Sequence, residues 1–543
     1  MGRAVAGGFF LVLAVTVTQA VTGMSPAAAR STPLPSGAAS DTLLAWGDDD
    51  GKLGDGTTSS RTAPVAVSLP SGTEVTAIAA GDSHSLALTS TGTVLAWGDN
   101  NDGKLGDGTT TSRTAPVAVS LPSGTEVTAI AAGDSHSLAL TSTGTVLAWG
   151  DNNDGKLGDG TTTSRSTPVA VSLPPDTTIT AIAATSDHSL ALTSTGTVLA
   201  WGENNDNKLG DGTFTSRSTP VAVNLPPGTK VTAIAAGFDH SLALTSTGTV
   251  VAWGENFGKL GDGTTSSRTA PVAVSLPPDT EVTAIAAGDN HSLALTSTGT
   301  VLAWGSNSEG QVGDGTTSRR RSAPVTVDLP PGTTITAIAG GRSHSLAVTS
   351  TGTALAWGEN VSGQLGDGTT TNRSTPVTVD LPPGTTITAV AAGDAHSLAL
   401  TAPPPVSTTT LQVTPTNPAA DQDITLTATV TCNVDTPTGA ITFRSNTTTL
   451  TTTPLTTTVT HTTTLPPGTH TITAHYASTN TCPSSQSTPV SLTVAPPPEE
   501  PDEPGLPITG PNMTTTIGAA ALFILAGVIL SYAARRRPLH GAR

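Results

Sequence analysis

Short apolar strings separated by turn residues fill most of the chain. In one representative stretch the strings are "PVAVSL" from Pro116, "VTAIAAG" from Val127, "HSLALT" from His136 and "TVLAWG" from Thr145. Because they are β-branched or alternating and are bounded by Gly, Pro, Asp and Ser, they predict four short strands. The "TSTG" between the last two strings predicts a tight hairpin, with Gly144 at a positive φ.

This four-strand unit recurs at intervals of 51 to 53 residues, and residues 62–113 are copied without change in residues 114–165. The seven Trp of the chain all lie in "AWG": Trp46, Trp97, Trp149, Trp201, Trp253, Trp304 and Trp357. Seven His begin the third string: His84, His136, His188, His240, His291, His344 and His396. Seven such units predict an all-β fold, a closed seven-bladed β-propeller. An open solenoid is the alternative, but it would need polar capping repeats, and the terminal copies are like the others.

The phase of the repeats also indicates closure. The first copy starts at Asp41 with "DTLLAWG" and lacks the "HSLALT" string, whereas the last copy ends with "HSLALT" from His396 and lacks "AWG". The two parts make one complete unit if the ring closes. We therefore expect the first strand to pair with the last, which removes the exposed edges of an open array.

The motifs "HSLALTSTGTVLAWG" and "N..GKLGDGT" resemble the repeat of the regulator of chromosome condensation family, over residues 41–401. The resemblance implies a seven-bladed propeller in which the seven His and seven Trp are buried structural residues, the His bonded to backbone. Lys replaces the Gln of the family's "GQLG" in five copies, whereas Gln311 and Gln364 keep the family residue. We expect the Lys of these copies to be a solvated or loop-bonding substitute.

The repeats do not predict catalysis, because seven equivalent His spread round a ring cannot converge on one substrate. The Asp residues of "GDGT" could indicate calcium, but "DNNDGKLGD" lacks the ligand spacing of a calcium loop. Turn and capping roles are expected for them. These residues are Asp55, Asp107, Asp159, Asp211, Asp262, Asp314 and Asp367. No cofactor and no metal site is expected.

Function is expected on the loops where the copies differ. Phe214, Phe238 and Phe257 stand where other copies have small or polar residues. Arg319, Arg320 and Arg321 form a basic cluster, and Arg342 replaces an Asp of most copies. Exposed aromatic and Arg side chains are typical interface anchors, so these seven residues are candidate partner contacts. Neutral drift is the alternative, because loops vary freely.

After a linker at residues 402–407 the sequence becomes rich in Thr and alternates apolar and polar residues. In "DITLTATVTC" one face holds Ile424, Leu426, Ala428, Val430 and Cys432. Several such strands predict a β-sandwich over residues 408–494. The segments "PTGAITF" and "LPPGTHTITAHY" resemble bacterial immunoglobulin-like modules.

Cys432 and Cys482 are the two cysteines of the chain. In an exported protein they are expected to form a disulfide. A metal pair or a reactive thiol is the alternative, although no third ligand lies nearby in the sequence.

The N-terminal segment predicts export. The apolar run after Arg3 has the length of a signal-peptide core and is followed by small-residue cleavage sites ending at Ala20 or Ala29. We predict a signal peptide at residues 1–29, with an uncleaved anchor as the alternative.

The C-terminal segment resembles the cell-wall sorting signal of Gram-positive surface proteins. A Pro-rich acidic spacer at residues 495–505 precedes the L-P-x-T-G motif, an apolar helix predicted to span a membrane at residues 513–534, and a basic cytoplasmic tail at residues 535–543. The motif is Leu506, Pro507, Ile508, Thr509 and Gly510. The resemblance implies that a sortase cleaves after Thr509 and joins the chain to peptidoglycan. A plain membrane anchor is the alternative.

The formal net charge of −17 argues against nucleic acid as a partner. Together these features predict a non-catalytic protein on the wall of a Gram-positive, actinobacterial cell, whose propeller binds an extracellular protein or glycan. One alternative is inhibition of a secreted or wall enzyme such as a β-lactamase, because a β-lactamase-inhibitory protein shares this propeller family. Another is a polysaccharide-degrading enzyme. It would need a clustered acid–base pair, whereas most carboxylates here recur once per repeat.

Overall fold

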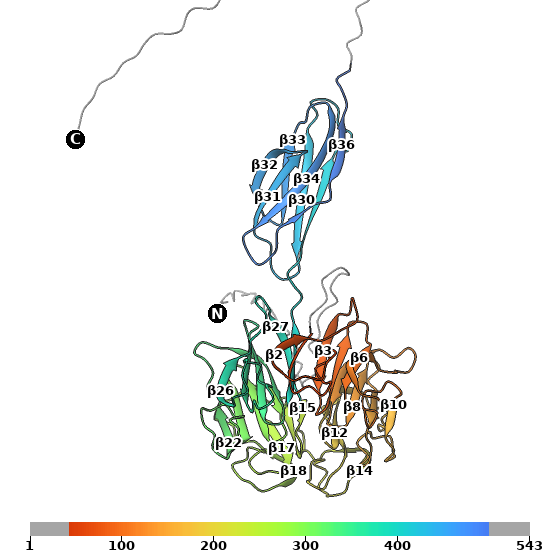
Figure 1. Ribbon diagram of the computed structural model, residues 1–543, viewed down its shortest axis with the longest axis vertical. Coiled ribbons are helices and arrows are strands. Elements are labelled where there is room, and N and C mark those ends of the chain that lie inside the picture. The colour runs from red at the N-terminus through yellow and green to blue at the C-terminus, as the bar shows by residue number, and fades with distance from the viewer. Residues whose placement is uncertain (1–42, 499–543) are drawn as a thin grey trace, which may run out of the picture. The chain divides into compact units, whose positions relative to one another are not determined.

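The structure, a computed structural model, describes residues 43–498, and the chain divides into two compact units between Val406 and Ser407 (Figure 1). The regular elements of residues 43–498 are all strands, and no helix there is long and apolar enough to cross a membrane. The predicted signal peptide (1–29), sorting motif (506–510), membrane helix (513–534) and basic tail (535–543) lie outside the described residues.

The first unit consists, in its described part, of seven four-stranded antiparallel sheets, which fit a β-propeller. The innermost strands are β3 (Val75–Ala80), β7 (Val127–Ala132), β11 (Ile179–Ala184), β15 (Val231–Ala236), β19 (Val282–Ala287), β23 (Ile335–Gly340) and β27 (Ile387–Ala392). The second strands are β4 (His84–Thr89), β8 (His136–Thr141), β12 (His188–Thr193), β16 (His240–Thr245), β20 (His291–Thr296), β24 (His344–Thr349) and β28 (His396–Thr401). The third strands are β1 (Leu43–Gly47), β5 (Val94–Gly98), β9 (Val146–Gly150), β13 (Val198–Gly202), β17 (Val250–Gly254), β21 (Val301–Ser306) and β25 (Ala354–Gly358). The outer strands are β2 (Arg61–Ala66), β6 (Arg113–Ala118), β10 (Arg165–Ala170), β14 (Arg217–Ala222), β18 (Arg268–Ala273), β22 (Arg320–Thr326) and β26 (Arg373–Thr378).

The predicted pairing of the two ends is confirmed. β1 pairs antiparallel with β28, from Leu43 opposite Leu400 to Gly47 opposite His396, in the sheet ordered β2-β1-β28-β27. The innermost strands of neighbouring sheets also contact one another in unbroken order, from β3 through β27 and back to β3. The seven sheets therefore form a closed ring.

The core of this unit lies between neighbouring sheets. One cluster joins Leu86 and Leu105 of one repeat to Ile130, Leu147 and Trp149 of the next. Because each sheet is covered on both faces, all six residues of the second strands are buried, for example in β8. These strands therefore carry an almost continuous run of small and apolar residues.

The outer strands begin earlier than the sequence pattern predicts. β6 spans Arg113–Ala118, whereas the "PVAVSL" string starts at Pro116, because Arg113 pairs with Gly98 before the register shifts. Each outer strand contains a Pro, such as Pro116, which cannot donate a backbone hydrogen bond. Such a residue protects a free sheet edge against pairing with another chain. The predicted hairpin turn is confirmed, since Gly144 has a φ of 80°.

The second unit is a sandwich of two sheets in its described residues. One sheet has the order β29 (Ser407–Thr414), β30 (Ile424–Cys432) and β33 (Thr458–Thr463). The other contains β32 (Thr448–Pro454), β31 (Gly439–Ser445), β34 (Gly468–Ser478), β35 (Ser485–Gln486) and β36 (Val490–Val494). The alternating residues Ile424, Leu426, Ala428 and Val430 enter the core with Phe443, as the pattern predicts.

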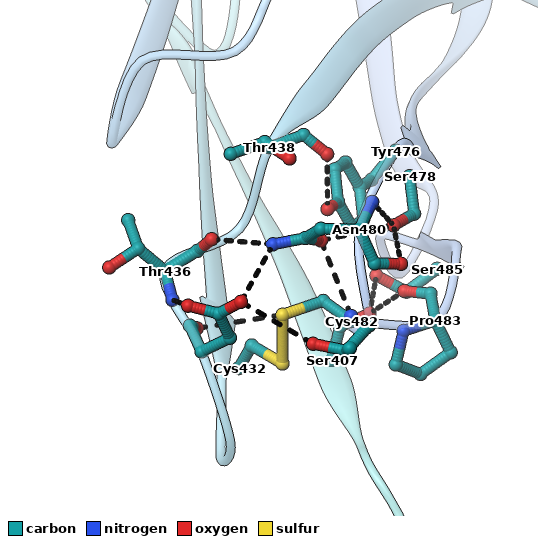
Figure 2. The surroundings of a disulfide bond; sticks show 12 residues. Ser407, Cys432, Thr436, Thr438, Tyr476, Ser478, Asn480, Cys482, Pro483 and Ser485 are labelled. Carbon is teal, nitrogen blue, oxygen red and sulfur yellow. Dashed lines mark hydrogen bonds between the residues drawn. A yellow bond between two sulfur atoms is a disulfide. The ribbon is translucent and has the colours of Figure 1, made fainter. Parts of the chain in front are cut away.

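The structure joins Cys432 and Cys482 in a disulfide with a Cα–Cα distance of 6.0 Å (Figure 2). Cys482 is buried in the sandwich core. Around the bridge, Asn480 donates to the carbonyl of Thr436 at 2.8 Å, and the Tyr476 hydroxyl donates to the carbonyl of Thr438 at 2.8 Å. The bridge thus ties the end of β30 to the connection after β34.

Candidate binding face

All the candidate loop residues lie at one end of the ring. In an antiparallel four-stranded sheet the first and third connections are at the same end. The short loop before each repeated His and the long loop after each "AWG" are these two connections, for example residues 133–135 and 151–164. We call the end of the ring that carries them the loop face.

The seven repeated His form a ring of contacts between sheets, each His bonding the Ser of the next repeat. The Nε2–Oγ pairs are His84–Ser137 (2.8 Å), His136–Ser189 (2.8 Å), His188–Ser241 (2.9 Å), His240–Ser292 (2.9 Å), His291–Ser345 (2.8 Å), His344–Ser397 (3.0 Å) and His396–Ser85 (2.9 Å). The expectation that these His bond to backbone is therefore wrong, because a hydroxyl from the neighbouring sheet fills the position.

The Ser hydroxyl in turn decides the tautomer of the His. Ser137 donates its hydroxyl proton to the carbonyl of Lys104 at 2.9 Å, so it accepts the Nε2 proton of His84. The indole N–H of Trp149 donates to the same carbonyl at 2.8 Å. One loop carbonyl thus holds the Ser and the Trp of the next sheet, and the same arrangement repeats round the ring.

These His are unsuited to acid–base chemistry. Each of them is completely buried, and burial lowers the pKa of His136 and of His344 to about 3. These His side chains stay neutral at physiological pH and have no access to solvent. Their role is to hold neighbouring sheets together. The structure thus gives them the scaffold role that the repeat pattern implies.

The Lys that replaces the family Gln is buried. It is therefore not solvated, and of the two expected roles it has the one of bonding to a loop. Lys156 lies 2.7 Å from Asp151 of its own loop and 2.8 Å from Asp187 of the next sheet. Burial acts to raise the pKa of Asp187, but the hydrogen bond and charge of Lys156 outweigh it and lower that pKa to about 2. This Lys contributes a charged bridge between sheets.

The Asp of "GDGT" has the expected turn role and a partner that the sequence did not reveal. Asp107 accepts from the backbone N–H of Thr109 at 2.9 Å, and its second oxygen receives Nη2 of Arg113 at 2.7 Å. Arg321 forms the equivalent ion pair with Asp314 at 2.5 Å. Arg321 is therefore a structural residue, in contrast to its assignment as a candidate partner contact.

The short loops bring carboxylates together where they surround the ring axis. Asp82, Asp134, Asp289, Asp394 and Arg342 line one cavity at the loop face. Burial, then the charge of Asp394, raises the pKa of Asp289 to about 7. Residues that recur once per repeat do converge here, contrary to the sequence argument. No group of His, Cys, Asp and Glu among residues 43–498 is arranged to hold a metal ion.

In the seven sheets, the exposed large hydrophobic side chains lie on the loop face of the consecutive sheets from β11–β14 to β23–β26. Among residues 43–401 they are Phe214 (64 % exposed), Phe238 (36 %), Phe257 (62 %) and Val361 (63 %). All four lie in loops between β13 and β26; Arg319 and Arg342 lie in loops of the same stretch, and Arg320 begins β22. We call these seven residues the divergent arc.

The sequence reasoning found six of these seven residues. Val361 was not predicted. The sequence does mark it, because "ENVSGQ" has an apolar residue where "DNNDGK" has a polar one. The opposite sector contains the two identical copies, residues 62–165, and has no exposed large hydrophobic side chain in the described structure.

Comparison with known families and proteins places both units. The model of the RCC1-like domain matches residues 42–400, and the model of the bacterial Ig-like domain (group 3) matches residues 409–495. The chain is 32 % identical over 360 residues to the ultraviolet-B receptor UVR8 of Arabidopsis thaliana, covering 66 % of this chain and 81 % of the receptor.

Two further similarities concern the propeller. Human E3 ubiquitin-protein ligase HERC2 is 35 % identical over 367 residues, which are 66 % of this chain but only 8 % of the ligase. The solved structure of Prp20p from Saccharomyces cerevisiae, which was studied together with its binding to Gsp1p and histones, matches with a TM-score of 0.61 at 27 % identity. That match covers 67 % of this chain and 92 % of Prp20p.

Proposed function

The chain belongs to the RCC1-like domain family, and from this premise we propose that it is a non-catalytic binding protein that engages a partner protein through the divergent arc. The observation that carries the proposal is the segregation of the exposed hydrophobic side chains. Phe214, Phe257 and Val361 are each more than half exposed and lie on loops at the same end of the ring, within the consecutive sheets from β11–β14 to β23–β26. Aromatic and Arg side chains are enriched at interfaces, where a few such anchors supply most of the binding energy.

The scaffold supports this role because it holds the loops rigidly. The bases of the long loops are fixed to the next sheet through buried carbonyl, Ser and Trp contacts, such as Trp253 with the carbonyl of Lys208 at 2.9 Å. Anchors on a rigid base lose little conformational entropy on binding. The relative Prp20p, with its described binding to Gsp1p and histones, shows that a propeller of this fold can serve protein recognition.

The proposed place of action is the outer surface of a Gram-positive cell. Its support is in the sequence: an apolar N-terminal run for export, and the "LPITG" motif followed by an apolar segment and Arg535, Arg536 and Arg537. The Ig-like unit and the acidic spacer would then hold the propeller away from the wall. Mass spectrometry of peptides released from purified peptidoglycan tests this directly. A wall-linked peptide ending at Thr509 is expected, and recovery of the whole chain only from the membrane would contradict the wall linkage.

The binding function is tested by capture from extracts of secreted and cell-envelope proteins. The bait is residues 30–498, which include every described residue. A matched bait carries Phe214→Ser, Phe257→Ser and Val361→Ser, all at solvent-exposed loop positions. A control bait carries Leu69→Ser and Leu121→Ser, which lie in the connections after β2 and β6 at the other end of the ring and partly cover the core.

A protein retained by the first and control baits and lost from the arc variant is the expected outcome. Equal retention by all three would place binding elsewhere, and retention by none would refute a protein-binding role in these extracts. If the captured partner is an enzyme such as a β-lactamase, an assay of its activity with and without the bait decides whether binding inhibits it.

The carboxylates around the axis are the one observation that favours an enzymatic alternative. Asp289 has a pKa of about 7, and burial raises that of Asp134 well above its usual range. Such shifts occur in general acids, but also in crowded structural carboxylates. We expect no turnover of a polysaccharide panel. Activity that is abolished by Asp289→Asn would establish the enzyme instead.

A further inference from the structure

The second unit has an edge strand without the usual protection against pairing with another chain. β33 lies at the end of the sheet ordered β29-β30-β33, so one of its two sides has no partner strand within the described residues. Natural sheets protect such an edge with Lys, with Pro or with a covering segment. The sequence of β33 is "TVTHTT", which contains no Pro, Lys, Arg or carboxylate. Another form of protection is therefore needed if this unit is to stay monomeric.

The surface around this edge is uncharged. Between Arg444 and Glu499 the sequence has no Lys, Arg, Asp or Glu. Solubility ordinarily depends on surfaces in which about 25–35 % of the residues are charged. Thr is the commonest residue of this stretch, so hydroxyl groups stand where charged groups are usual. A modification of these hydroxyls that adds polar groups would supply the missing solvation.

The outer face of the three-stranded sheet is an array of Thr side chains. Thr462 of β33 lies opposite Thr425 of the central strand β30, and Thr460 lies opposite Thr427. The two Thr of the central strand are partly buried, whereas Thr460 and Thr462 are exposed. The edge strand therefore presents its hydroxyls to solvent more fully than the strand beside it.

Some of these hydroxyls are occupied by the fold and others are free. Thr456 donates to the carbonyl of Thr458 at 2.8 Å, and the Thr458 hydroxyl bonds that of Thr429 at 3.2 Å. Four exposed Thr have hydroxyls without a hydrogen-bond partner among the described residues, two in β33 and one on each side of it. We call these four the threonine edge: Thr457, Thr460, Thr462 and Thr464.

We propose that the second unit is O-glycosylated on the threonine edge. Segments rich in Thr and Pro are typical of O-glycosylated stalks, and Pro454, Pro466 and Pro467 bracket this one. An edge strand also presents its acceptors in extended form, with a free backbone side along which an enzyme can bind as an added strand. Bulky sugars beside that unpaired side obstruct a second chain and solvate an uncharged surface. The proposal goes beyond the binding function, because the divergent arc belongs to the first unit and plays no part in it.

The modification is a group transfer to each hydroxyl by a separate glycosyltransferase. Oγ1 of the Thr attacks the anomeric carbon of a sugar phosphate donor and forms a new C–O bond. The bond between that carbon and the phosphate oxygen breaks, and the phosphate leaves with the electron pair. The hydroxyl proton passes to a base of the transferase, so the step needs no oxidant or reductant.

The test is mass spectrometry of the full chain isolated from its native host. Chymotrypsin, which cleaves after Leu and Tyr, is used because the sequence has no Lys or Arg between Arg444 and Arg535. Electron-transfer fragmentation leaves sugars on their side chains and so locates them. Hexose-sized mass increments are expected on the threonine edge, and none on Thr425 and Thr427. An unmodified threonine edge would overturn the proposal, and so would equal modification of the central strand.

Two double variants made in the native host separate the edge from the rest of the sheet. Thr460→Val with Thr462→Val removes two acceptors while keeping β-branched side chains that suit a strand. The increments at these two positions should be lost. Thr425→Val with Thr427→Val is the matched control and should leave the increments on the edge unchanged.

The protective role is measured by sedimentation velocity. Residues 1–498 are secreted by the native host, and residues 30–498 are made in a host that lacks protein O-glycosyltransferases. The unmodified protein should self-associate at concentrations at which the glycosylated one is monomeric. Equal monomers would contradict the protection of β33 by sugars. Dimers of an unmodified chain from the native host would show that a second copy covers the edge instead.

Discussion

His396 bonds Ser85 across the junction where the last repeat meets the first, with an Nε2–Oγ distance of 2.9 Å between residues 311 positions apart. The contact is identical in kind to the six others round the ring. Ser85 passes the interaction on by donating to the carbonyl of Lys52 at 2.9 Å. Closure is therefore secured by a buried polar contact as well as by the pairing of β1 with β28.

Removing the Ser85 hydroxyl should weaken the contact between the last repeat and the first, and so lower the free energy of unfolding. In Ser85→Ala the Nε2 proton of His396 loses its acceptor in a buried site, which costs about 1–3 kcal/mol of unfolding free energy. Urea unfolding followed by Trp fluorescence measures it. Ser90→Ala, at an exposed turn position, should change the midpoint little. Equal midpoints for the two variants would show that the junction contact does not stabilise the fold.

The first glycine of each "GDGT" motif should not tolerate a side chain, because a neighbouring Trp occupies the space as well as because its φ is positive. Gly106 (φ 67°) faces Trp149, and an added Cβ would lie 2.7 Å from the indole nitrogen. Gly124 has a similar φ of 77° but nothing within 4 Å. Gly124→Ala should therefore cost only the left-handed backbone penalty of about 1–2 kcal/mol. Gly106→Ala should cost distinctly more, as a comparison of the two melting temperatures will show.

Acid should destabilise the propeller through its buried His. Burial lowers the pKa of His136 to about 3 and that of His291 to about 4, from an ordinary value of 6.5. Between these values and 6.5 the unfolded chain binds protons that the folded one does not. The free energy of unfolding should fall as the pH drops below about 6.5, by up to about 1.4 kcal/mol per pH unit for each His. A urea midpoint at pH 5 equal to that at pH 7 would contradict this.

Asp289 should have the opposite effect between its ordinary pKa and neutrality. Its pKa is raised from 3.8 to about 7, so the folded chain holds this proton more tightly than the unfolded chain, and stability is lost as the pH rises through this range. Asp289→Asn should stabilise the protein more at pH 8 than at pH 5, by up to about 1.4 kcal/mol for each pH unit between pH 5 and 7. Asp176→Asn, an exposed position in the connection between β10 and β11, is the control for loss of a charge. If Asp289→Asn raised the free energy of unfolding equally at both pH values, the crowding of carboxylates at the axis would be contradicted.

Reduction of the disulfide should affect the second unit alone. Closing a loop of 50 residues contributes about 4 kcal/mol in the chain-entropy account. The double variant Cys432→Ala, Cys482→Ala should become sensitive to proteolysis after Val406. Its Trp fluorescence transition should stay in place, because all seven Trp lie in the first unit. Free thiols found in the exported protein would refute the bridge.

The strands and the closure of the ring were predictable because their signals are local. Alternating apolar residues and turn-forming Gly residues define each strand, and the incomplete first and last copies, at Asp41 and His396, predict the pairing of β1 with β28. Most of the divergent arc was predictable for a similar reason. Against near-identical copies, a single Phe or Arg in a loop stands out.

The sequence by itself thus determined the number of repeats, the all-β architecture, the order of the units and most of the variable loop residues. Only the tertiary structure decided that Ser137 is the partner of His84, that Lys156 is buried beside Asp187, that Arg321 is structural and that Asp82 and Asp289 share a cavity. Except for the pair of Arg321 with Asp314, which lies within one repeat, these facts concern contacts between residues of different repeats. Strand periodicity and turn chemistry act within one repeat, whereas these contacts arise when packing and closure of the ring set neighbouring sheets face to face.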